Sequence, residues 1–242
     1  MSISKEGKLK MVRLEMSKDP QRKIRRDNMS ELGIPTWTLA QDALKAGDIE
    51  RASELFDYGC SEFRQVHDAM AQGTCESLDY IAQTFGEEQV GNVWRSQVLT
   101  MASTVRELCA VEVNERVYRI AEVFRGHCGG HTGLGDMTIV EEAERFVLIH
   151  DPCGTGGKLR RTGQYGVTKK AYPWSWGKVG VPYFCTHCCI FWELTGIEVC
   201  GYPLRIHENV DKPQEPCIQY IYKKPELVPE VYFARLGMER TE

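Results

Sequence analysis

Apolar residues recur every three or four positions through the first half of the chain, which is the spacing of amphipathic helices. A short helical run over 40–46 precedes Asp48, a residue type favoured as the N-cap of a following helix. That helix is expected to cover 49–70, and a separate one 74–86. The apolar series over 90–120 contains no proline and fits either one long helix or two helices placed end to end.

The pattern changes near Gly126, after which the regular segments are short. Residues 145–150 and 217–223 have the β-branched and aromatic content of strands, and 203–209 alternates like one. Residues 188–196 read as a short helix that ends at glycine. The prediction is therefore an α+β protein.

Three regions follow from this change in pattern. Residues 1–35 are charged and poor in aromatics, which indicates a flexible or loosely docked arm. Residues 36–125 form a helical N-terminal half, packed on a mixed α/β C-terminal half at 126–242 that is rich in cysteine and histidine. This second half holds seven of the ten cysteines and five of the six histidines, so the chemistry is expected there.

Composition and charge narrow the class of protein. The formal charge of -4 and the pI of about 5.9 provide no positive field for nucleic acid. No stretch resembles a secretory signal or a membrane span, so we expect a cytoplasmic protein with no membrane partner. Cysteines in a reducing compartment indicate metal binding, catalysis or burial rather than disulfides. Burial is expected for the four at positions 60, 75, 109 and 200.

The first cluster in the second half is the loop "GHCGGHTGLGD". His127 and His131 flank Cys128 and are four residues apart, a spacing that suits two metal ligands on a helix. The glycines disfavour a helix here, but a loop can also bring such ligands together. Either metal binding or a plain polar turn fits this segment.

The second cluster, "IHDPCGTGGKLRR", leaves a predicted strand and enters a glycine-rich loop. His150 and Asp151 are the candidate proton carriers, and Cys153 is a candidate metal ligand or nucleophile. Arg160 and Arg161 are candidates for binding an anionic group of a substrate, since a guanidinium can form two parallel hydrogen bonds with a carboxylate. The alternative is a hairpin turn whose basic residues face water.

The third cluster is "FCTHCC", in which Cys185 and Cys188 have the spacing of two ligands for one zinc or iron ion. A redox pair is the rival interpretation, because a helix N-terminus lowers the pKa of a thiol. No second C-x-x-C motif is present, so the other ligands must come from separated positions, with Cys128, His187, Cys189 and Cys217 as further candidates. Cys189 precedes an apolar run and is expected in the core.

Aromatic residues precede this third cluster in "AYPWSWGKVGVPYF". Trp174 and Trp176 are candidates for the wall of a small-molecule pocket, although core packing explains them nearly as well. His67 lies on the predicted helix over 49–70 next to Asp68, where a solvent-exposed or capped histidine is favoured over a ligand.

The order of features from Cys185 to "PCIQYIYK" at Cys217 resembles the L-2-amino-thiazoline-4-carboxylic acid hydrolase-like family, and more distantly the vinyl-reductase-type ligand-binding domain. The resemblance covers about the last third of the chain. It implies an α+β domain that binds a small organic molecule, in some members beside a cysteine-ligated metal, and hydrolysis of a ring C–N bond. The histidine-rich loop at 126–135 departs from that pattern.

The sequence thus favours a metal-dependent hydrolase or lyase that acts on a small anionic organic molecule. His127, His131, Cys153, Cys185 and Cys188 would hold the zinc or iron ion, and the front helices would close the pocket or form a homodimer. One alternative is a small-molecule sensor or binding module with a structural metal. Another is a metal-free enzyme with Cys153 as nucleophile beside a histidine.

Overall fold

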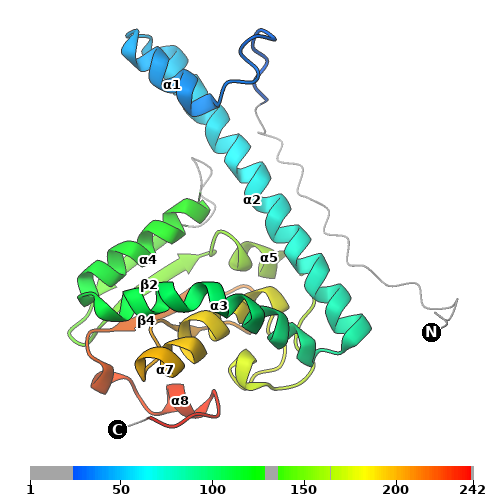
Figure 1. Ribbon diagram of the computed structural model, residues 1–242, viewed down its shortest axis with the longest axis vertical. Coiled ribbons are helices and arrows are strands. Elements are labelled where there is room, and N and C mark those ends of the chain that lie inside the picture. Colours follow the sequence, from blue (N-terminus) through cyan, green and yellow to red (C-terminus); the bar gives the residue numbers. More distant parts are fainter. Residues whose placement is uncertain (1–23, 129–135, 164, 241–242) are drawn as a thin grey trace, which may run out of the picture.

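The computed structural model describes residues 24–128, 136–163 and 165–240, and it shows helices in front of a small sheet (Figure 1). The helices gather in the N-terminal half, and the four strands all belong to the C-terminal half. The α+β class is therefore confirmed. Within these residues, no helix is both long enough and apolar enough to cross a membrane.

Helix α1 (Thr36–Lys45) is followed by α2 (Ile49–Phe85), which extends well beyond the body of the molecule (Figure 1). Asp48 is the N-cap of α2, as predicted, and its side chain accepts a hydrogen bond from the Arg51 amide. The separate helix expected over 74–86 is wrong, because α2 continues without a break. The Thr74 hydroxyl donates to the Met70 carbonyl one turn earlier instead of starting a new helix.

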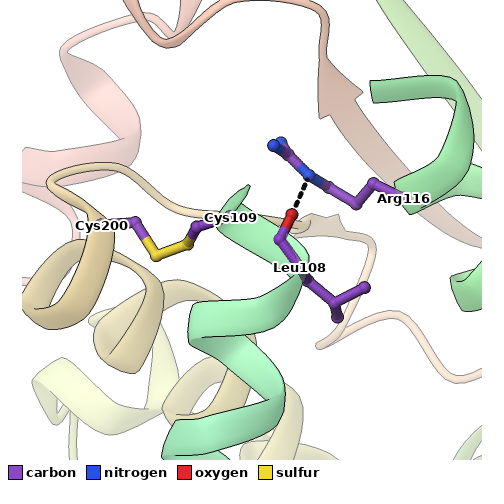
Figure 2. Close-up of a disulfide and its surroundings, with 4 residues drawn as sticks. All are labelled: Leu108, Cys109, Arg116 and Cys200. Carbon is purple, nitrogen blue, oxygen red and sulfur yellow. Dashed lines mark hydrogen bonds between the residues drawn. A yellow bond between two sulfur atoms is a disulfide. The ribbon is translucent and has the colours of Figure 1, made fainter. Parts of the chain in front are cut away.

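The third apolar series forms two helices, α3 (Glu88–Ala110) and α4 (Val113–Cys128). The chain becomes extended at Val111, and the Arg116 side chain donates from Nε to the Leu108 carbonyl at the end of α3 (Figure 2). This contact satisfies one of the carbonyl groups that a helix end leaves without a partner.

A disulfide joins Cys109 at the end of α3 to Cys200, 91 residues later (Figure 2). The expectation that these two cysteines are merely buried thiols is therefore wrong. Their pairing depends on two distant helix ends meeting in space, with Cα atoms 6.2 Å apart.

The sheet contains β1 (Asp136–Glu141), β2 (Arg145–Asp151), β3 (Ile206–Glu208) and β4 (Cys217–Tyr222), in the order β1-β2-β4-β3 with antiparallel pairs throughout. The last three match predicted strands, whereas β1 was not predicted. Helix α4 packs on the apolar part of one sheet face through Val117, Ile120 and Phe124, against Phe146, Leu148 and Ile221. The end of this same face carries polar residues and forms the base of the candidate site.

Three further α-helices lie between β2 and β3, and a fourth follows β4. They are α5 (Gly156–Thr162), α6 (Thr186–Cys188), α7 (Thr195–Cys200) and α8 (Val231–Ala234). A π-helical turn at Cys189–Leu194 joins α6 to α7 and is buried throughout. The helix predicted to stop at Gly196 therefore runs on, and Gly201 with φ of 81° ends it. Such π-helical turns are often found at functional sites.

Residues 24–35, the described part of the predicted arm, contact the helices through Arg25. Its guanidinium donates to the carbonyl groups of Glu31, Leu32 and Ile34 and to the Thr36 hydroxyl, and it pairs with Asp27. This end of the arm is therefore held by a buried cation.

Candidate functional site

A cavity of about 380 Å³ lies between the sheet face and the helices. Its walls come from α2, α3, α4, the start of α5 and the segment that leads through α6 into the π-helical turn. The lining is mostly apolar, but it contains four cysteines and four histidines from positions far apart in the chain: His67, His127, Cys153, Cys185, His187, Cys188, His207 and Cys217. An apolar cavity with a few convergent polar groups is the usual form of a small-molecule site.

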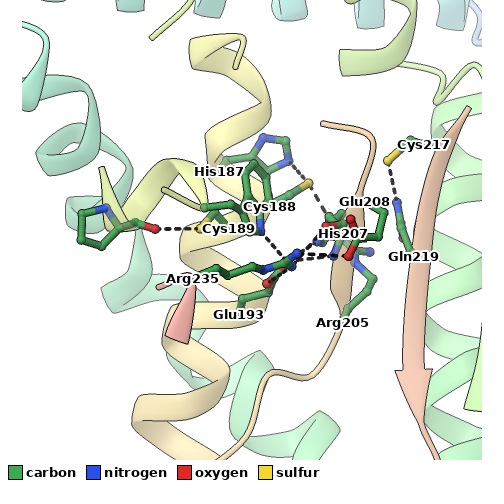
Figure 3. Close-up of polar contacts among 12 residues, drawn as sticks. His187, Cys188, Cys189, Glu193, Arg205, His207, Glu208, Cys217, Gln219 and Arg235 are labelled. Atoms are coloured by element: carbon green, nitrogen blue, oxygen red, sulfur yellow. Dashed lines mark hydrogen bonds and ion pairs between the residues drawn. The ribbon is translucent and has the colours of Figure 1, made fainter. Parts of the chain in front are cut away.

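Cys188 carries the most perturbed thiol in this cavity. His187 Nε2 lies 3.4 Å from Cys188 Sγ, and the Arg205 guanidinium lies 3.9 Å from the same sulfur (Figure 3). Burial disfavours the thiolate, but His187 and His207 outweigh burial and hold the pKa of Cys188 well below its ordinary value. These contacts therefore favour the thiolate form of Cys188.

His187 is oriented as the partner of this thiolate. Its Nδ1 lies 2.6 Å from the Phe184 carbonyl, which can only accept, so Nδ1 carries a proton and Nε2 faces the sulfur. Burial opposes the charged ring, yet the neighbouring Cys188 thiolate raises the pKa of His187 above its ordinary value. Each of these two side chains therefore favours the charged form of the other.

A second buried pair, His207 and Glu193, lies beside the thiolate (Figure 3). The Glu193 carboxylate accepts from the backbone amide of His207 at 2.9 Å, and its Oε1 lies 3.0 Å from Nδ1 of the same residue. It also accepts from Trp176 Nε1 and Arg235. The carboxylate accepts the Nδ1 proton, so Nε2 is the ring nitrogen of His207 that can act on Cys188.

Glu193 is charged despite its complete burial. Desolvation would raise its pKa, but Arg235 and His207 reverse that effect and lower it. Arg235 in turn pairs with both Glu193 and Glu208. Hydrogen bonds and ion pairs that extend from His207 through Glu193 to Arg235, at the end of α8, therefore fix the orientation of His207.

Burial acts in the opposite direction on two other thiols of the cavity, Cys185 and Cys217. Burial is the main cause that raises the pKa of Cys217 to about 12 and that of Cys185 well above its ordinary value. The charge of Cys188 and Cys153 raises both further, which indicates that the four sulfurs share one region. A Cβ added at Gly156 would lie 2.8 Å from Cys185 Sγ, so glycine is needed for this approach.

The predicted metal ligands are only partly described. Cys153, Cys185, Cys188 and His127 all line the cavity, with His127 exposed on α4, while His131 and the Cys128 side chain lie outside the described residues. No group of three or more His, Cys, Asp or Glu side chains is arranged to hold a metal ion within the described ranges. Cys189 is buried with its Sγ 3.4 Å from the Pro173 carbonyl, as expected for a core residue.

The two predicted proton carriers lie apart from the cavity lining. His150 is completely buried on β2, its ring 4.1 Å from that of Phe124, and neither ring nitrogen has a partner among the described residues. Burial lowers the pKa of His150 to about 3, so the ring is neutral. Asp151 is exposed and forms an ion pair with Arg161.

Only two of the four predicted substrate-binding residues line the cavity. Arg160 and Trp176 line the cavity, whereas Arg161 and Trp174 do not. The Arg160 guanidinium already donates to the carbonyl groups of Asn209 and Glu215, and Trp176 donates to Glu193.

His67 was expected to be exposed or capped. It is mostly buried, lines the cavity, and has its Nε2 2.8 Å from the Thr155 hydroxyl.

Sequence reasoning did not select Glu193, Arg205 or His207. Two signals pointed to them. Glu193 is a single carboxylate inside the apolar run "CIFWEL", and the alternation over 203–209 places Arg205 and His207 on the same face of the strand.

Comparisons with known proteins give no further assignment: no family model, curated protein or solved structure matches this chain.

Proposed function

We propose that the protein is a cysteine-thiolate enzyme that hydrolyses an ester-like or amide-like bond in a small organic molecule, with Cys188 as the nucleophile. The observation that carries the proposal is the enclosed Cys188 thiolate, 3.4 Å from an imidazole and beside the buried His207–Glu193 pair. A thiolate with an oriented histidine and a carboxylate behind that histidine is the arrangement of nucleophilic catalysis. The nucleophile is thus Cys188 rather than Cys153.

The steps follow from these positions. The Cys188 thiolate attacks the electrophilic carbon, and the His187 imidazolium gives its Nε2 proton to the leaving oxygen or nitrogen. His207, held by Glu193, then accepts a proton from the water that attacks the thioester. Hydrolysis returns the thiolate, and the proton taken by His207 restores the His187 imidazolium through solvent.

A metal-dependent hydrolase or lyase is the second candidate. It is favoured by the four sulfurs, Cys153, Cys185, Cys188 and Cys217, that line the same cavity, since soft thiolate ligands suit zinc or iron. As arranged, these side chains do not make a set of three ligands. The thiolate enzyme is therefore preferred.

Reaction with p-nitrophenyl acetate tests the proposal. We expect a burst of p-nitrophenolate equal to the enzyme concentration, and an acetyl group that mass spectrometry places on Cys188. Cys188→Ser should abolish the burst, whereas Cys153→Ser should keep it. His207→Gln should keep the burst and slow the steady state, because only the second step needs this base.

Three outcomes would contradict the proposal. An acetyl group on Cys153 would select the other nucleophile. Stoichiometric zinc or iron that Cys188→Ser removes would select the metal-dependent enzyme. Folded protein without burst or metal would favour a binding module.

A further inference from the structure

Arg205 differs from the other buried arginines in having no carboxylate or carbonyl partner in the described part of the chain. Arg25 and Arg235 pair with carboxylates, and Arg116 and Arg160 donate to backbone carbonyl groups. Arg205 is only 2% exposed, and among the described residues its Nε has no partner and its guanidinium makes one polar contact, the 3.9 Å approach to Cys188 Sγ. A buried cation without an adequate partner is costly, which indicates that a ligand completes it.

Two aromatic rings pack against the Arg205 guanidinium. The guanidinium carbon lies 4.3 Å from the ring centre of Trp192 and 4.7 Å from that of Phe124. These aromatic contacts hold the plane of the group and leave its N–H edge as the part that can receive a ligand. Arg205 lines the cavity next to the thiolate.

The surroundings of Arg205 are also positively polarised. His187, His207 and Arg205 approach the single Cys188 thiolate, and the carboxylate nearest to them, Glu193, is already used by four donors. An anion would therefore enter a low-dielectric site that has a fixed cation and little competing negative charge.

We propose that Arg205 is the specificity residue of this site and binds a substrate carboxylate next to the reacting carbon. This inference rests on the proposed function, because the spacing is measured from the nucleophile. With 3.9 Å between Cys188 Sγ and the guanidinium, a carboxylate on Arg205 lies only about one to three bonds from the carbon under attack. The substrate class is a short-chain or cyclic carboxylic acid whose ester-like or amide-like carbon is close to the carboxylate.

Alkylation with iodoacetate and iodoacetamide tests this assignment. Both reagents form an S–C bond to Cys188 and release iodide, and they differ in that only iodoacetate carries a carboxylate one bond from the reacting carbon. We expect the ratio of the two rates at Cys188, read by peptide mapping and normalised to glutathione, to favour iodoacetate at least ~10-fold, about 1.4 kcal/mol. The iodoacetate rate should saturate.

Arg205→Met should remove this preference while Cys188 still reacts with iodoacetamide. A change in thiolate content affects both reagents alike, so the ratio isolates the carboxylate contact. Arg205→Lys should keep part of the preference, and Arg161→Met, outside the cavity, should keep all of it. Rapid iodoacetamide reaction without iodoacetate preference, or a preference that survives Arg205→Met, would overturn the role of Arg205 alone. An unreactive Cys188 would instead overturn the proposed function.

Discussion

The buried His150 makes the stability of the fold depend on pH in a calculable way. Its pKa is about 3 in the folded protein because burial and the positive charge of Arg205 disfavour the imidazolium, whereas the unfolded chain has the ordinary value of 6.5. The unfolded state therefore binds a proton first as the pH falls. The stability associated with the neutral ring is complete above about pH 6.5 and is lost progressively between about pH 6.5 and pH 3.

The size of the effect follows from the two pKa values. From pH 7.5 to pH 4.5, one group with these values lowers the free energy of unfolding by about 2.6 kcal/mol. His150→Leu removes the titrating group with a side chain of similar size. We expect the stability difference between His150→Leu and the natural protein to shift by about 2.6 kcal/mol in favour of the variant over that range.

Urea unfolding followed by tryptophan fluorescence at four pH values gives this difference directly, because all other titrating groups are common to both proteins. Leu148→Val is the matched control: it lies on the same face of β2, is completely buried, and should have a deficit of about 1 kcal/mol that does not change with pH. A His150→Leu difference that stays constant within about 0.5 kcal/mol would refute the neutral, buried imidazole.

Three further predictions concern stability. Glu193→Gln should lower the free energy of unfolding by about 3 kcal/mol, because it leaves Arg235 facing a neutral amide. The control Glu198→Gln, in the exposed ion pair with Arg95, should change the free energy of unfolding by less than about 1 kcal/mol, and chemical denaturation of both variants checks this. Gly196→Ala should destabilise the protein by about 1–3 kcal/mol, since its Cβ would lie 2.8 Å from a backbone nitrogen. Gly73→Ala, which has open space in α2, should stabilise the protein by about 0.5–1 kcal/mol, so thermal melting should show a lower melting temperature for the first variant and a higher one for the second. Reduction of the disulfide between α3 and α7 should lower the stability by about 2–4 kcal/mol because it frees a loop of 91 residues, and unchanged denaturation in dithiothreitol would contradict this.

Local patterns in the sequence were sufficient for most of the elements. The start of α2 at Asp48 and the strands β2 and β4 depend on neighbouring residues alone, and they were predicted. The break expected at Thr74 was wrong because a hydroxyl can either cap a new helix or bond back to the preceding turn, and the sequence does not distinguish the two. β1 was missed because its pairing partner, β2, supplies much of its stability.

The site was predicted less completely because its parts meet through tertiary contacts. Three of the four cysteines in the second and third clusters, Cys153, Cys185 and Cys188, do line one cavity, as their residue types indicated. The state of each thiol, however, depends on which cations approach it, and His207 and Arg205 come from a strand that no cysteine motif contains. The disulfide partner of Cys109 is equally beyond local reasoning.

The register of β3 on β4 unites the chemistry of the site with the packing of the core. His207 pairs with Gln219, which places His207 and Arg205 on the cavity face, while Leu204 and Ile206 point to the opposite side and are fully buried. A shift of one residue would exchange these two sets, moving Arg205 and His207 into the core and two aliphatic side chains beside Cys188. The burial of Leu204 and Ile206 therefore fixes the positions of Arg205 and His207. The contacts that stabilise the fold in this way also place the proposed anion-binding group beside the proposed nucleophile.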